Sequence, residues 1–167
     1  PMALFGQMLP AVFRGAGYNA QILPPETEES FERGRKQCRG TECLPAPATI
    51  GSLIHTLEQQ GEDLSRHAIF MPTAAGPCRF GQYNQLTRMA LDRIGMDEVF
   101  ITSPGSDDTY AGVGTRLQLR LYQGVLLNDV LTKLLCRLRP YELTPGLVED
   151  IIDDGQADLV RMLEQNR

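Results

Sequence analysis

The stretch HAIFMPTAAGPCRFGQYNQLTRMALDRIGMDEVFIT, residues 67–102, decides the predicted fold. Its first part, His67–Met71, is a compact apolar segment of the length and composition of a β-strand. Apolar residues then recur at helical spacing over residues 80–94, and Gly95 ends that pattern. Glu98–Thr102 is a second strand-like segment. The order strand, loop, helix, glycine, strand is typical of a parallel β-sheet.

The N-terminal part of the chain repeats this order. Pro1–Phe5 is short and apolar and predicts a strand, and Gln7–Gly15 carries apolar residues at helical spacing. Tyr18–Leu23 is a further strand candidate, closed by two prolines. The pattern therefore predicts an α/β fold, a Rossmann-like three-layer domain with a parallel sheet of about four strands.

Four more helices complete the prediction. Their expected ranges are Glu26–Lys36, Thr49–Gln60, and two long C-terminal helices, Arg116–Arg139 and Thr144–Gln165. We expect residues 1–142 to form the Rossmann-like domain and residues 143–167 to form a helix packed on it.

The composition is that of a globular protein, because 42% of the 167 residues are hydrophobic and 22% are charged. A net charge of -5 argues against nucleic acid as a partner. No apolar run approaches the roughly 20 residues that span a bilayer, and no signal-peptide pattern is present, so we expect a cytoplasmic protein with reduced thiols. Because Pro1 already lies in a predicted strand, we expect the chain to be part of a larger polypeptide.

Three cysteines are the candidate site. Cys38 and Cys43 lie in the loop CRGTEC, and Cys78 follows the third predicted strand and precedes a helix. A helix N-terminus and a cationic neighbour such as Arg79 both favour a thiolate. Ligands in open parallel sheets collect beyond the carboxyl ends of the strands, where the Cys78 loop is expected. We therefore predict that both loops meet at one thiolate site that binds an iron–sulfur cluster.

Other interpretations of these residues stay open. The same cysteines could bind zinc or no metal in a structural or docking module, or Cys38 and Cys43 could form a redox-active disulfide. Cys136 lies among leucines and is expected to be a small buried side chain.

A proton-transfer site is a further alternative. It would use Asp107, Asp108 and Tyr110 after the fourth predicted strand, together with Glu42. His55 and His67, the only histidines, are expected to be structural.

The cysteine segments resemble a known family. Residues 38–45 and the segment from Met71 to Tyr83, with its Gly-Pro-Cys-Arg-Phe-Gly-Gln-Tyr sequence, look like the iron–sulfur subunits of 2-hydroxyacyl-CoA dehydratases and benzoyl-CoA reductases. The closest similarity is to the large relatives in which such a region is fused to a CoA-substrate-specific enzyme activase. The resemblance covers roughly residues 1–142.

This resemblance implies a [4Fe–4S] cluster held by Cys38, Cys43 and Cys78, with Arg79 beside it. It also implies an ATP-dependent activase domain or subunit as the partner, which supplies a low-potential electron under anaerobic conditions for an acyl-CoA substrate. The chain is shorter than a full dehydratase subunit, which has two α/β halves, and the acyl-CoA pocket would need the missing parts.

Overall fold

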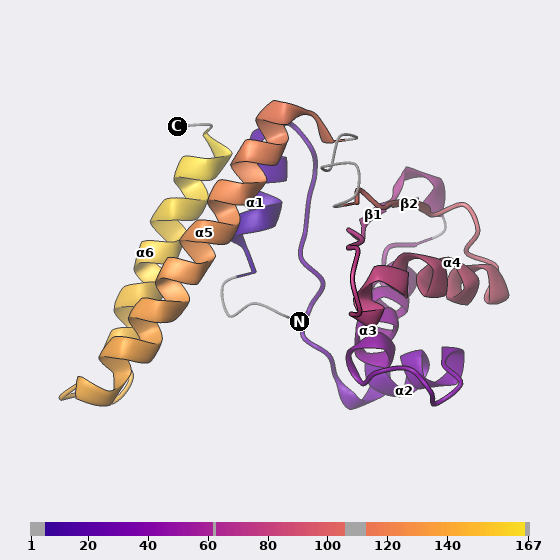
Figure 1. Cartoon of the computed structure of the whole chain (residues 1–167), viewed down its shortest axis with the longest axis horizontal. Helices are drawn as coiled ribbons and strands as arrows, with labels where there is room; N and C mark the ends of the chain where they lie inside the picture. The colour runs from indigo at the N-terminus through magenta and orange to yellow at the C-terminus, as the bar shows by residue number, and fades with distance from the viewer. Residues whose placement is uncertain (1–5, 62, 106–112, 166–167) are drawn as a thin grey trace. The chain divides into compact units, whose positions relative to one another are not determined.

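Helices dominate the computed structural model, which describes residues 6–61, 63–105 and 113–165. The chain divides into two compact units (Figure 1). Unit 1 is Leu23–Val113, and unit 2 combines the N-terminal segment through Ile22 with Gly114–Arg167. Both units are helical, but only unit 1 carries strands among the residues described.

Unit 1 begins with two closely packed helices, α2 (Glu28–Gln37) and α3 (Pro45–Gln59). Thr27 caps α2 through a reciprocal pair of hydrogen bonds with Ser30, and proline is accommodated in the first turn of α3. The helices touch backbone to backbone, because a Cβ atom on Gly34 would overlap the Pro47 carbonyl oxygen. Likewise, a Cβ atom on Gly51 would overlap the Ser30 carbonyl oxygen.

The two strands of unit 1 are short and parallel. After the 3₁₀ helix η1 (Leu64–Arg66), β1 (Ala68–Phe70) pairs with β2 (Phe100–Thr102), and Ile69 lies opposite Ile101. The crossover between the strands contains the 3₁₀ helix η2 (Arg79–Gln82) and α4 (Tyr83–Arg93).

One hydrophobic core holds these elements together. Its buried residues come from α3, β1, α4 and the residues flanking the strands: Ala46, Ile50, Leu53, Ile54, Leu57, Ile69, Met71, Tyr83, Ala90, Leu91 and Val99. The half-buried Cys38 and Cys43 pack against the same core, so the cysteine loop is anchored on it.

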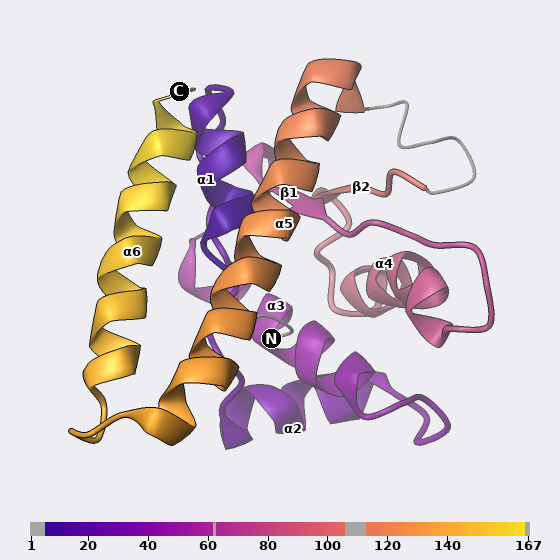
Figure 2. The ribbon, with the colours of Figure 1, turned by 60° about the vertical axis from the view of Figure 1, so that its left-hand side comes forward.

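Unit 2 contains α1 (Met8–Gly15), α5 (Thr115–Leu138), the 3₁₀ helix η4 (Arg139–Tyr141) and α6 (Leu147–Glu164). Helices α5 and α6 run antiparallel and side by side, with α1 packed against both (Figure 2). Its core contains Met8, Ala11, Val12, Leu131, Leu135, Ile152 and Leu163. Within the described ranges, none of the helices combines the length and the apolar character that crossing a membrane requires.

The predicted Rossmann-like, four-stranded sheet is wrong. The described residues contain one two-stranded parallel sheet, and the fold is mostly helical. Tyr18–Leu23 is extended chain rather than a strand, because Tyr18 is 62% exposed and no neighbouring strand pairs with this segment in the residues described. Pro1–Phe5 lies outside the described residues.

Several local predictions are confirmed. The strands predicted at His67–Met71 and Glu98–Thr102 are present, shortened to three residues each, and they pair in parallel. All six predicted helices are present with shifted ends; α3, for example, begins at Pro45 rather than at Thr49. The division of the chain into residues 1–142 and 143–167 stays a prediction.

Candidate functional site

The loop that carries Cys38 and Cys43 joins α2 to α3 and is fixed by its own carboxylate. Glu42 accepts hydrogen bonds through Oε2 from the backbone N–H groups of Arg39, Gly40 and Thr41, at 3.0–3.1 Å. Gly40 has a φ of 86°, a conformation that glycine adopts without strain. The backbone donors hold the pKa of Glu42 below its ordinary value, so the carboxylate stays charged in the loop.

The loop that carries Cys78 follows β1 and is held in a tight turn. The Thr73 hydroxyl donates to the carbonyl oxygen of Gly81 at 2.8 Å. A Cβ atom on Gly81 would lie 2.5 Å from the Ala74 carbonyl oxygen, so only glycine fits there. Gly76 in the same loop has a φ of 125°, a backbone conformation that residues with a side chain rarely adopt. Cys78 is exposed at the start of η2.

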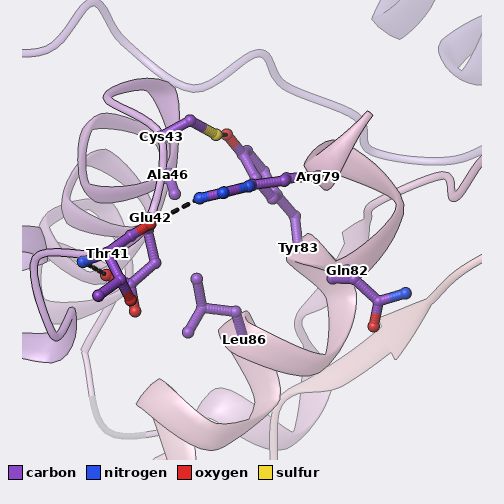
Figure 3. A pocket seen from close by; sticks show the side chains of 8 residues that line it. All are labelled: Thr41, Glu42, Cys43, Ala46, Arg79, Gln82, Tyr83 and Leu86. Atoms are coloured by element: carbon purple, nitrogen blue, oxygen red, sulfur yellow. Dashed lines mark hydrogen bonds between the residues drawn. The ribbon is translucent and has the colours of Figure 1, made fainter. Parts of the chain in front are cut away.

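Two side-chain contacts join these loops (Figure 3). Arg79, next to Cys78, donates from its guanidinium to the Thr41 carbonyl oxygen at 2.6 Å. The Cys43 sulfur lies 2.8 Å from the Tyr83 hydroxyl oxygen. The loop between α2 and α3 therefore meets the segment between β1 and α4, although about 40 residues separate them in the sequence.

The contacts border a pocket of about 280 Å³. Its lining combines loop, η2 and helix residues: Thr41, Glu42, Cys43, Ala46, Arg79, Gln82, Tyr83 and Leu86. Figure 3 shows the Arg79 side chain extending toward Thr41 beside the Cys43–Tyr83 contact. The pocket thus offers a thiol, a phenol, a guanidinium and an apolar floor.

Electrostatics links Tyr83 to three cysteines. Tyr83 is only 5% exposed, and burial raises the pKa of its hydroxyl well above the ordinary value. The hydrogen bond with Cys43 and the electrostatic influence of Cys43, Cys78 and Cys38 raise this pKa further. Among the described hydrogen bonds, the Tyr83 hydroxyl contacts only the Cys43 sulfur of the three.

Cys38 has its own environment at the end of α2. Burial raises the pKa of its thiol, the Glu42 carboxylate raises it further, and the Arg93 guanidinium opposes them. Arg93 also donates to the Gln37 carbonyl oxygen at 3.0 Å, which ties the end of α2 to α4. The net result is a pKa above the ordinary value for this thiol.

The three cysteines share a neighbourhood but not a closed set of metal ligands. Among the residues described, no three side chains of His, Cys, Asp or Glu converge closely enough to hold a metal ion. All four cysteines are free, so the structure contains no Cys38–Cys43 disulfide. Cys136 is exposed on α5, so the prediction of a buried side chain is wrong: Leu135 faces the core, and the next residue along a helix points elsewhere.

The proton-transfer candidates are only partly visible. Asp107, Asp108 and Tyr110 lie outside the described residues, and the Glu42 carboxylate is engaged by its own loop. The sequence predicted a helix over residues 80–94, which includes Tyr83, but gave no sign of its contact with Cys43. The sequence feature that could have pointed to Tyr83 was its position, five residues after Cys78 at the end of the segment from Met71 to Tyr83.

Comparisons of the chain with models of protein families, with curated proteins and with solved structures gave no match.

Proposed function

We propose that unit 1 binds a [4Fe–4S] cluster through Cys38, Cys43 and Cys78 and takes part in ATP-driven, low-potential electron transfer to an acyl-CoA. The observation that carries the proposal is the meeting of two distant cysteine loops, through Arg79 and Thr41 and through Cys43 and Tyr83. Thiolates are the ligands of iron–sulfur clusters, and Cys38, Cys43 and Cys78 are free cysteines.

The residues present fit such a group in chemical type. Cys43 lines the pocket, Cys38 is anchored on the core next to it, and Cys78 is exposed. Because the thiols do not converge as they stand, cluster binding would require the two cysteine loops to move closer together. When bound, a cluster would supply one-electron transfer, while Arg79 would offset part of its negative charge.

The partners in this proposal are an ATP-dependent activase domain or subunit and an acyl-CoA, in the cytoplasm. They come from the resemblance of the cysteine segments alone. The chain's own residues contribute the thiolates, their orientation and the charge balance around them.

A second candidate is a structural or docking module whose cysteines bind zinc or no metal. The absence of a converged ligand set in the part of the chain that the structure describes favours this alternative. Zinc differs from a cluster in requiring a tetrahedral set of four ligands in a structural site, of which Cys38, Cys43 and Cys78 would supply three.

Anaerobic purification and reconstitution with iron and sulfide separate the two candidates. We expect about four iron atoms per chain and a brown visible spectrum in the wild type, and loss of both in Cys78→Ser, because one of three thiolates is removed. Cys136→Ser is the matched control, since it replaces the other exposed cysteine, and it should keep its iron. A colourless wild type without iron, or stoichiometric zinc that iron does not replace, would count against the cluster.

A further inference from the structure

Helix α5 carries large apolar side chains on two sides. Leu131 and Leu135 lie in the core of unit 2, where α1 packs against both α5 and α6 (Figure 2). On the outward side, exposed apolar residues recur every three or four positions and form what we call the α5 stripe: Leu119, Tyr122, Leu126, Val130 and Leu134. A surface helix normally has a polar face opposite its core face, whereas a helix that is apolar all round is usually covered on both sides.

The surface that covers the α5 stripe should itself be apolar, and unit 2 is the part of the chain that offers such a surface. Among the described residues of unit 1, the large exposed apolar side chains are three, on separate elements: Leu44, Met89 and Phe100. In unit 2, apolar exposure continues beyond the stripe through the turn and onto the start of α6, at Leu138, Tyr141, Leu143, Leu147 and Ile151. The best match for unit 2 is therefore the unit 2 of a second copy.

Charge also favours a second copy. Helix α5 has four basic residues and one acidic residue, whereas α6 has six acidic residues and one basic residue. Asp150, Asp153 and Asp154 of α6 take part in none of the described ion pairs. This negative charge next to α5 repels an anionic membrane or a nucleic acid, and it attracts a basic helix such as the α5 of another molecule.

The size of the surface indicates that both long helices take part. Over its 24 residues α5 is about 36 Å long and about 10 Å wide, so its outward face alone covers on the order of 360 Å². A stable interface buries about 800 Å² on each partner, which α5 reaches only together with the 18 residues of α6. A two-fold pair satisfies this requirement, because each copy then contributes the same two helices.

We propose that unit 2 is a self-association surface: two copies of this chain pair through their α5 stripes, and the basic side chains of each α5 lie next to the acidic α6 of the other copy. Analytical ultracentrifugation of the full chain over about 1–100 μM tests the pairing. We expect a concentration-dependent species of twice the chain mass of 18.5 kDa. A wild type that stays monomeric throughout overturns the proposal, including one that instead co-floats with phosphatidylserine vesicles.

Leu126→Glu tests whether the stripe is the contact. It places a charge in the middle of the apolar surface, so the dimer should dissociate at about tenfold or more higher concentration. Leu126 is 46% exposed, so the circular dichroism spectrum should be unchanged; Tyr122→Gln is a second, milder variant that should act in the same direction. Met89→Glu, at a residue of unit 1 that is 47% exposed, is the matched control and should associate like the wild type. A dimer that both stripe variants leave intact overturns the proposal.

A charge exchange tests which helices face each other. Reversing two basic residues of α5, in Lys133→Glu with Arg137→Glu, should weaken the dimer, and so should Asp153→Lys with Asp154→Lys on α6. Combining all four substitutions in one chain restores opposite charges between the α5 of one copy and the α6 of the other. We therefore expect association to recover in the combined variant, and failure to recover contradicts the pairing of α5 with the partner's α6.

Discussion

Unit 1 and unit 2 are both mostly helical, but their helices are held together in different ways. In unit 1, short elements are joined by loops that side chains tie to the backbone, as Glu42, Thr73 and Arg79 do. In unit 2, two long helices and α1 meet through apolar side chains at helical spacing. The candidate site residues Cys43, Arg79 and Tyr83 therefore lie where irregular backbone is fixed at many points.

Among the substitutions that test this difference between the two units, Gly34→Ala in unit 1 is expected to have the largest effect. The new Cβ atom would overlap the Pro47 carbonyl oxygen, so α2 and α3 must separate, at a cost of about 3 kcal/mol or more. Hydrogen exchange read by mass spectrometry should show loss of protection in α2, α3 and the cysteine loop, with α5 and α6 still protected. Gly155→Ala in α6 is the matched control: its Cβ meets no atom within 4 Å, so we expect a gain of about 0.5–1 kcal/mol. Equal loss of protection in α5 and α6 would mean that the two units unfold as one.

Leu135→Ala tests the same difference from the other side, because it should destabilise unit 2 and not unit 1. Leu135 is buried in the core of that unit, and its truncation should lower the free energy of unfolding by about 2–5 kcal/mol. Chemical denaturation measures the loss, and iron uptake by unit 1 should be unaffected below the transition. The adjacent Leu134→Ala, at a residue that is 40% exposed, should cost much less. Equal losses for the two variants would contradict the assignment of the buried face of α5.

The smallest expected effect concerns pH and the first turn of α2. The hydrogen bond from Arg33 holds the pKa of Glu29 below its ordinary value of 4.5. A lowered folded-state pKa means that the contribution to stability is complete above the unfolded-state pKa and is lost as pH falls through the folded-state pKa. Glu29→Gln should therefore be slightly less stable than the wild type at about pH 7, and the gap should close at about pH 3. Urea titrations at both values measure it, and a gap that persists in acid would show a cause other than charge.

The local part of this fold was readable from the sequence, and the non-local part was not. The segments around Ile69 and Ile101 were predicted as strands, and they pair in parallel, because short apolar runs bounded by proline and glycine carry their own signal. The segment Tyr18–Leu23 carried a similar signal without a partner to pair with, and a sequence pattern does not show whether a partner exists.

The candidate site shows the same limit. The composition of the two cysteine loops and the position of Cys78 before a helical segment were visible in the sequence. The contact between Cys43 and Tyr83 was not, because it depends on how α3 packs near α4, across 40 residues of chain. The engagement of Glu42 with its own loop was also missed, since its carboxylate could equally have faced the pocket.

Helix α5 has a practical consequence for handling the protein. Leu119, Tyr122, Leu126, Val130 and Leu134 recur every three or four residues along it, and all are exposed. They form a hydrophobic stripe about 20 Å long, because an α-helix rises 1.5 Å per residue. Sulfate and similar salts strengthen hydrophobic contacts between such stripes on separate molecules, so concentrated sulfate favours aggregation. Dilute, sulfate-free buffers are therefore the better medium for loading iron into this chain.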